Sequence, residues 1–296
     1  MGVSIFSPAK INLFLAITGR RADGFHDLVS VAAPLDFGDT LAVEATDERP
    51  EAGRYALRCS DPTVPTDETN LVLKAARAYA AATGWKGGAN FSLEKRIPPG
   101  AGLGGGSSNA VAALRALDRL AGGLLGDARM VELAAALGSD CAMFVKNEPV
   151  VMRGRGERIA ALPAAACARL RGRRVLVFKP SFGISTPWAY GRMIARGTDY
   201  LPAAEAERRI GEWMESGAPA EDLLFNNMEL AADEKFLALP VLREKLWREF
   251  GVAVRMSGSG SASFALLPDE APSAAMTARI RECWGPGALV QEARIA

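Results

Sequence analysis

The sequence predicts an α+β protein with two domains. Its 296 residues, 49% of them hydrophobic and 23% charged, are enough for two domains or one large one. The predicted strands and helices are mixed without the regular βαβ repeat of a doubly wound parallel sheet. Around residues 154–173 the composition becomes rich in Arg, Gly and Ala, as is common between domains. We therefore expect one domain over residues 1–160 and a second over residues 161–296.

The elements of the first half are predicted from the spacing of their apolar residues and from serine or glycine at the helix ends. In chain order we expect strands over Ile11–Thr18 and Asp39–Ala45, a helix over Asn70–Thr83, a strand over Asn90–Lys95, a helix capped by Ser107, and a helix over Asp127–Leu137 that stops at Gly138. A strand thus leads into a glycine-rich loop, and the loop leads into a helix.

The second half mixes both kinds of element in the same way. Val175–Lys179 has the pattern of a strand, and Pro187 favours the start of a helix at Thr186. We further expect helices over residues 203–216, 219–231, 235–250 and 273–284, two strands flanking residues 257–261, and a last strand over residues 288–295.

Charge and cysteine usage exclude several classes of protein. With 35 Lys and Arg against 34 Asp and Glu, the bulk charge gives no sign of a nucleic-acid partner. The four cysteines are scattered without a C-x-x-C pair, which supports neither zinc nor a disulfide framework. The apolar stretch Ile159–Ala168 is far shorter than the roughly 20 residues of a membrane span. We expect a cytoplasmic protein with reduced thiols that binds neither membrane nor nucleic acid.

The segment from Ile97 to Ala113, IPPGAGLGGGSSNAVAA, points most directly to a function. Glycine lets successive backbone N–H groups point the same way, because no Cβ stands in the path. The first N–H groups of the following helix add partial positive charge. The segment therefore predicts a loop that binds a polyphosphate.

Two common phosphate-binding loops fit this segment less well. A Walker loop places a lysine after its last glycine, but Gly106 is followed by serine. Gly100, Gly102 and Gly105 have the G-x-G-x-x-G spacing, yet the ribose-binding acid expected about 20 residues further on is missing from a convincing place. A nicotinamide-binding loop is therefore disfavoured.

Two other short motifs match catalytic patterns in isolation. Asp36-Phe37-Gly38 resembles a protein-kinase metal motif, but the chain has no His-Arg-Asp. Ser7 and Lys10 have the S-x-x-K spacing of serine acylases, but no Lys-Thr-Gly follows. A serine acylase stays an alternative, which a covalent β-lactam adduct at Ser7 would support.

Three segments far apart in the sequence resemble the motifs of one family. They are Ser7–Leu15, Pro98–Ser108 and Arg255–Phe264, the last with a Ser-Gly-Ser-Gly run. In this order they are similar to the motifs of the GHMP kinase superfamily, and the resemblance covers essentially the whole chain. It implies an ATP-dependent kinase with an N-terminal domain like ribosomal protein S5 domain 2 and a ferredoxin-like C-terminal domain.

Pro8–Leu13 and the segment RADGFH ending at His26 resemble one branch of this superfamily, which phosphorylates the 2-hydroxyl of a cytidine diphosphate methylerythritol. In this branch a histidine reads the edge of the cytosine and two aromatic rings enclose the base. These roles fall on His26, on Phe25 and on Tyr190. From the residues alone, a hairpin turn at Asp23-Gly24 with Phe25 in the core stays open.

The resemblance also implies which groups carry out phosphoryl transfer. Asp140 matches the catalytic base, and Lys10 matches the lysine that holds the acceptor hydroxyl and stabilises charge developing on oxygen. Ala142 stands where the family usually carries a proline. From the residues alone, the plainer interpretations are favoured, which are a helix cap for Asp140 and a solvated charge for Lys10.

The other implied roles concern ATP, the acceptor alcohol and magnesium. The residues expected to bind ATP are Asn70, Lys95, Pro98, Pro99, Gly100, Ala101, Gly102, Leu103, Gly104, Gly105, Gly106, Ser107 and Ser108. Those expected to bind the acceptor are Asn12, Phe25, His26, Tyr190, Ser257, Gly258, Ser259 and Gly260. Ser108 is also the expected ligand of Mg²⁺, with no acidic partner assigned. The plainer alternatives are a helix cap at Asn70, a surface charge at Lys95 and an ordinary hairpin over residues 257–261.

Three functions remain in competition. The first is the kinase of the cytidylyl alcohol, and the second is a related kinase of the homoserine or mevalonate type. The third is a nucleotide-binding module without turnover. All three have a small-molecule ligand, and we expect a monomer or a weak homodimer.

Overall fold

The computed structural model describes residues 2–47 and 53–296, which form two compact units. The first unit contains the described parts of residues 1–9, 38–99 and 104–147, and the second contains residues 10–37, 100–103 and 148–296. Strands β1 (Gly2–Arg20) and β2 (His26–Thr46) contribute to both. The domain boundary at residue 160 stays a prediction.

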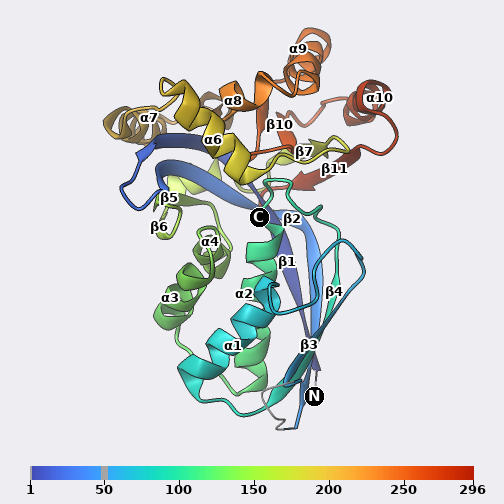
Figure 1. Cartoon of the computed structure of the whole chain (residues 1–296). Coiled ribbons are helices and arrows are strands. Elements are labelled where there is room, and N and C mark those ends of the chain that lie inside the picture. Colours follow the sequence, from blue (N-terminus) through green and yellow to red (C-terminus); the bar gives the residue numbers. More distant parts are fainter. Residues whose placement is uncertain (1, 48–52) are drawn as a thin grey trace. The chain divides into compact units, whose positions relative to one another are not determined.

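The first unit packs helices against a sheet. β3 (Tyr55–Cys59) runs parallel to β4 (Gly88–Glu94), and β4 runs antiparallel to β2 with Leu41 opposite Leu93. Its helices lie on one side of β3 and β4 (Figure 1); they are α1 (Leu71–Thr83), α2 (Gly105–Leu120), α3 (Asp127–Leu137) and α4 (Cys141–Lys146). The core lies between, since Leu73, Leu114 and Phe91 are all buried.

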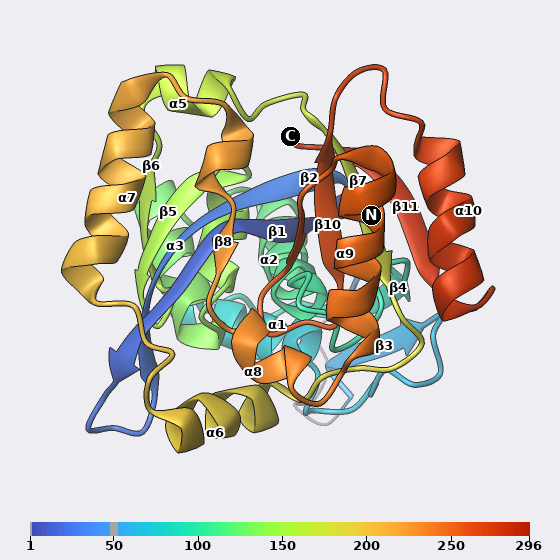
Figure 2. The same cartoon turned by 90° about the horizontal axis from the view of Figure 1, so that it is seen from above.

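The second unit contains a four-stranded antiparallel sheet. Its strand order is β11 (Leu289–Arg294), β7 (Arg174–Lys179), β10 (Ser263–Leu267) and β9 (Val254–Met256). Helices α9 (Ala238–Phe250) and α10 (Ser273–Trp284) pack on this sheet (Figure 2). Phe178, Leu246 and Ile280 meet in the resulting core.

The remaining elements of the second unit surround the other strands. β5 (Val150–Gly154) pairs with β6 (Arg158–Ala161) and with the start of β2, and β8 (Phe225–Asn226) runs parallel to β1. The helices are α5 (Ala164–Ala168), α6 (Thr186–Arg196), α7 (Ala203–Ser216), the 3-10 helix η1 (Ala220–Leu223) and α8 (Glu229–Asp233). Within the described ranges, no helix has the length and apolar character needed to cross a membrane.

Much of the predicted secondary structure is confirmed, including the α+β class. α7 and α10 occupy the predicted ranges 203–216 and 273–284. The side chain of Asn70 caps α1 by accepting a hydrogen bond from the backbone N–H of Val72 at 2.9 Å. β1 and β2 reach further than predicted, and β3, β5 and β6 had no predicted counterpart.

Two predicted elements are wrong. Ser107 does not cap α2, because Gly104 precedes the helix with φ of 72° and Gly105 already has helical geometry. The predicted helix over residues 219–231 is replaced by η1, β8 and α8. There the side chains of Asn226 and Asn227 accept hydrogen bonds from the backbone N–H groups of Met228 and Ile17, both at 2.9 Å, which competes with helix formation.

Two glycines of α7 offer a matched test of backbone conformation. Gly217 ends the helix with φ of 67° and Gly211 lies within it, and a Cβ added to either would meet no atom within 4 Å. We expect Gly217→Ala to lower the free energy of unfolding by about 1 kcal/mol, because an L residue is strained at this φ. Gly211→Ala should raise it by about 0.8 kcal/mol. Urea unfolding measures both, and equal signs would contradict this helix end.

Candidate active site

A buried carboxylate organises the glycine-rich loop in the first unit. Asp39 is fully buried, and its Oδ1 accepts hydrogen bonds from the backbone N–H groups of Arg96 and Ile97 at 2.7 and 2.8 Å. Its Oδ2 accepts one from Asn109 Nδ2 at 2.9 Å and pairs with the Lys95 ammonium. Because a buried charge is costly unless several donors satisfy it, this arrangement fixes the residues that precede the loop.

Lys95 is therefore not the solvated surface charge that the sequence alone allowed. Its side chain is only 6% exposed, and Asp39 compensates its charge. A Cβ on Gly105 would lie 3.2 Å from Lys95 Nζ and 3.0 Å from Ile97 Cγ2. Glycine at this position thus allows the first turn of α2 to approach the ammonium group closely.

The first turn of α2 is also held by hydroxyl groups. Asn109 Nδ2 donates to Ser7 Oγ at 2.8 Å, and Ser7 Oγ donates to Ser108 Oγ at 2.8 Å. Ser7 is fully buried, so it cannot meet an acyl substrate, which argues against the serine acylase alternative. α2 begins with Gly105, Gly106 and Ser107. Their free backbone N–H groups form the positive end of the helix dipole, which can bind phosphate.

Asp140 stands directly before α4 in the first unit. It occupies the cap position, as the plainer alternative proposed, but its side chain makes no capping hydrogen bond. The next residue, Cys141, is fully buried, and burial raises the pKa of its thiol to about 12. The thiol therefore stays protonated at neutral pH, and the half-buried Asp140 supplies the carboxyl group at this helix start.

Lys10 and Asn12 form a buried polar pair in the second unit. They point to the same face of β1, and Lys10 Nζ donates to Asn12 Oδ1 at 2.6 Å. Asn12 Nδ2 donates in turn to Ser30 Oγ at 2.9 Å. Lys10 is 3% exposed, so the alternative of a solvated charge is wrong.

The turn over residues 257–261 packs against the first part of the glycine-rich loop. Ser257 Oγ donates to the Gly102 carbonyl at 3.0 Å, and the backbone N–H of Ala262 donates to the Ala101 carbonyl at 3.0 Å. Asn226 Nδ2 holds the turn from behind by donating to the carbonyls of Met256 and Gly258 at 2.7 and 2.9 Å. The turn is thus more than a plain hairpin, since it supports the loop.

The same turn is joined to α6, which carries Tyr190. Ser259 Oγ and Thr186 Oγ1 share a hydrogen bond of 2.8 Å. The ring of Tyr190 stacks on His26 with centroids 4.5 Å apart. These contacts connect α6 with both the turn and the start of β2. They therefore link four of the residues expected to bind the acceptor, which are Tyr190, His26, Ser259 and Gly258.

His26 is suited to read a neutral base. It is 7% exposed, and burial together with Arg20 holds the pKa of its imidazole below the ordinary value. The ring is thus neutral at pH 7 and offers one donor and one acceptor.

Phe25 lies in the turn between β1 and β2, and Gly24 has φ of 86° there. The hairpin turn considered from the sequence is present, but Phe25 is not part of the core. Its ring is 53% exposed and lies under the guanidinium of Arg155 at 4.8 Å. An exposed aromatic face beside a cation can accept a planar ligand.

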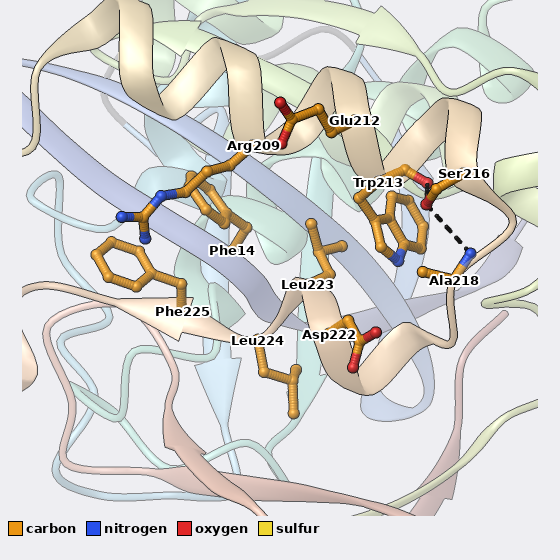
Figure 3. A pocket seen from close by; sticks show the side chains of 10 residues that line it. All are labelled: Phe14, Arg209, Glu212, Trp213, Ser216, Ala218, Asp222, Leu223, Leu224 and Phe225. Carbon is orange, nitrogen blue, oxygen red and sulfur yellow. Dashed lines mark hydrogen bonds between the residues drawn. The ribbon is translucent and has the colours of Figure 1, made fainter.

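A separate pocket in the second unit contains none of the expected site residues. Its volume is about 310 Å³, and Figure 3 shows Arg209 lying over Phe225 beside Phe14. Two of its charged residues are already paired along α7, Arg209 with Glu205 and Glu212 with Arg208. We therefore assign it no part in the chemistry.

The residues placed by the structure supply few ligands for a metal ion. In the described ranges, no group of three or more His, Cys, Asp or Glu side chains is arranged to hold one. Ser108 offers a hydroxyl that is hydrogen-bonded to Ser7. This donor set fits Mg²⁺ only as an ion bound mainly by phosphate and water.

Several residues that shape the site were missed from the sequence. Asp39 lies on the same buried face of β2 as Phe37, Leu41 and Val43. An aspartate among alternating apolar residues of a strand could have been recognised from the sequence as a buried charge that needs partners. Asn226 gave no such signal, because only the fold brings it to the turn over residues 257–261.

The fold and motifs correspond to a known class of enzyme. Residues 70–148 match the model of the GHMP kinases N terminal domain, and residues 201–285 match GHMP kinases C terminal. A crystal structure of 4-(cytidine 5'-diphospho)-2C-methyl-D-erythritol kinase is 33% identical with a TM-score of 0.76, and the match covers 99% of this chain and 100% of that one. Homoserine kinase from Cytophaga hutchinsonii shares the fold, with 16% identity, a TM-score of 0.73 and coverage of 99% and 95%. The protein is an ATP-dependent kinase with the predicted two-domain GHMP fold.

Curated relatives show to which family of GHMP kinases the chain belongs. The 4-diphosphocytidyl-2-C-methyl-D-erythritol kinase of Protochlamydia amoebophila is 36% identical over 92% of this chain and 86% of its own length. That of Methylacidiphilum infernorum is also 36% identical, over 91% of this chain and 88% of its own. The chain belongs to the family of 4-diphosphocytidyl-2-C-methyl-D-erythritol kinases.

Gly102 and Gly100 provide a matched test of the contact between loop and turn. Both have positive φ, but a Cβ on Gly102 would lie 2.1 Å from the Ser257 carbonyl oxygen, whereas one on Gly100 meets no atom within 4 Å. We expect Gly102→Ala to cost about 3 kcal/mol of unfolding free energy and Gly100→Ala about 1 kcal/mol. Urea unfolding compares the two, and similar costs would contradict the described packing.

Asp39→Asn tests the buried ion pair. The variant keeps the shape but leaves the Lys95 ammonium without a counter-charge, and we expect a loss of about 3 to 5 kcal/mol in unfolding free energy. Glu68→Gln removes one partner of the exposed pair with Arg77 and should cost below about 1 kcal/mol. If Asp39→Asn costs no more than Glu68→Gln, the network does not hold the loop.

Proposed function

We propose that the protein transfers the γ-phosphoryl group of ATP to the 2-hydroxyl of 4-(cytidine 5'-diphospho)-2-C-methyl-D-erythritol, in the non-mevalonate route to isoprenoid precursors. Family membership over nine-tenths of the chain carries this proposal. The neutral, stacked His26 beside Tyr190 supports it, because a neutral imidazole has one N–H group that can donate to a ring nitrogen of a pyrimidine.

ATP binding falls to the glycine-rich loop. The backbone N–H groups at the start of α2 would bind phosphate oxygens, and the residues from Pro98 to Ser108 would form the cradle. Asn70 and Lys95 would lie beside the nucleotide. The Asp39 network supports this assignment, because it holds Lys95 and the first turn of α2 in place before ATP arrives.

The phosphoryl transfer would use Asp140 and Lys10 in different roles. Asp140 would accept the proton of the 2-hydroxyl as it attacks the γ-phosphorus in line with the leaving ADP. Lys10 would orient the acceptor and stabilise negative charge on its oxygen. The hydrogen bond from Lys10 to Asn12 supports this role, because it fixes the direction of a buried ammonium before substrate binds.

The cytidylyl group would bind at the turn between β1 and β2. Phe25 and Tyr190 would enclose the base, and His26 would read its edge. The turn over Ser257, Gly258, Ser259 and Gly260 would close over the acceptor. The exposed ring of Phe25 supports a role in stacking on the base, and the buried imidazole of His26 supports a role in hydrogen bonding to it.

The accompanying properties are proposals as well. Mg²⁺ would enter with ATP and neutralise phosphate charge, with the Ser108 hydroxyl nearby. We propose a cytoplasmic monomer or weak homodimer, with domains over residues 1–160 and 161–296 and no nucleic-acid partner.

Incubation of the purified protein with ATP and a panel of alcohols tests the proposed reaction. We expect phosphorylation of the cytidylyl alcohol and none of homoserine or mevalonate. Turnover of either of these alone would identify a related kinase, and turnover of no alcohol would favour a nucleotide-binding module.

Asp140→Asn tests the base. Loss of the proton acceptor should lower kcat by about 10²- to 10⁴-fold with little change in the affinity for ATP. Asp127→Asn, a matched change at an exposed position at the start of α3, should leave kcat within about twofold. An unchanged kcat in Asp140→Asn would exclude Asp140 as the base.

A further inference from the structure

Tyr200, which has no role in the proposed function, makes a direct contact with His26. The Tyr200 hydroxyl lies 3.2 Å from His26 Nε2, and the two rings stack at 5.9 Å with an interplanar angle of 20°. Tyr190 stacks on the same imidazole at 4.5 Å. His26 thus stacks with two tyrosines, and its contact with Tyr200 also joins polar atoms of the two side chains.

The segment that carries Tyr200 is fixed on both sides. The backbone N–H of Leu201 donates to the Ile17 carbonyl at 3.1 Å, which ties the segment to β1. Asn227 Nδ2 donates to the carbonyls of Asp199 and Ile17 at 2.8 and 2.9 Å. The Tyr200 ring therefore occupies a defined position next to the first residue of β2.

The hydrogen bond between these two side chains decides where the imidazole proton resides. Both groups are neutral near pH 7, since burial lowers the pKa of His26 and raises that of Tyr200. A phenol O–H is the better donor and an imidazole nitrogen the better acceptor, so the hydroxyl donates to Nε2. The one imidazole proton then lies on Nδ1, because the hydrogen bond at one ring nitrogen sets the state of the other.

We propose that Tyr200 is a positioning residue that holds His26 in the Nδ1–H tautomer and thereby selects cytosine over uracil at the base site. Cytosine presents an unprotonated N3 that accepts a hydrogen bond from Nδ1–H. Uracil presents an N3–H, which places two donors against each other. The choice of base rests on the proposed function, whereas the tautomer rests on the contact between Tyr200 and His26 alone.

Tyr200→Phe tests the tautomer without reference to activity. The substitution keeps the stacked ring and removes the hydroxyl. Because His26 is the chain's one histidine, the histidine signals in the spectrum come from this imidazole alone. Two-bond proton–nitrogen correlations on isotope-labelled histidine distinguish the tautomers. We expect Nδ1–H in the wild type and a shift toward Nε2–H, the form that free imidazole side chains prefer, in Tyr200→Phe. An Nε2–H wild type, or the same tautomer in both proteins, would overturn the proposal.

Calorimetric titration with CDP and with UDP tests base selection in the same proteins. The wild type should prefer CDP, and Tyr200→Phe should lose about tenfold of that preference, as expected for one hydrogen bond. Tyr79→Phe is the matched control, because it removes a hydroxyl that donates to Asp118 at 3.1 Å in the first unit and should leave the preference unchanged.

The two readouts separate the possible failures. If the wild type prefers CDP and Tyr200→Phe keeps that preference, Tyr200 does not select the base, although the proposed function stands. If the wild type binds CDP and UDP equally and does not phosphorylate the cytidylyl alcohol, the proposed function fails and base selection fails with it. The histidine spectra then still show whether Tyr200 sets the tautomer.

Discussion

The charge of Asp39 is the constraint on which the first unit depends. A carboxylate without solvent contact is tolerated only when donors surround it, and here two backbone N–H groups, an amide and an ammonium do so. These donors come from the residues directly after β4 and from α2, so satisfying one charge fixes both ends of the glycine-rich loop. The loop can then keep an open backbone, rich in glycine, without losing its position.

The second unit reaches a similar rigidity with neutral groups. Asn226 holds the turn over residues 257–261 through two carbonyls, and Asn227 links β1 to the segment before α7. Amide side chains suit this purpose because they donate and accept at once and carry no desolvated charge. Some buried side chains of this unit are charged, and among them Lys10 donates to Asn12, which directs its ammonium group.

Local sequence patterns predicted much of the secondary structure. They failed where contacts between residues far apart in the sequence determine the local conformation. Apolar spacing and a terminal glycine were sufficient for α7, and an asparagine cap for the start of α1. The region 219–231 has helical composition, but Asn226 and Asn227 use their side chains to bind backbone elsewhere in the fold. In the candidate site, the motifs predicted roles for Lys10 and His26, and these roles stay predictions. Tyr200 is joined to His26 across 174 residues and leaves no pattern in the sequence. Asp39 is an intermediate case, because its position among alternating apolar residues could have predicted its burial but not its partners.

The order in which the chain enters the two units has a consequence for its synthesis. All segments of the first unit precede residue 148, so it can fold while the ribosome is still producing the remainder. The second unit cannot, because Pro34 and Asp36 in β2 are hydrogen-bonded by the backbone N–H groups of Ala296 and Arg294, and Leu35 bridges Ile295. The middle of β2 must wait for residues 294–296. Until these residues are synthesised, this short stretch of β2 lacks part of its hydrogen bonding, although β4 and β5 can already pair with the two ends of the strand.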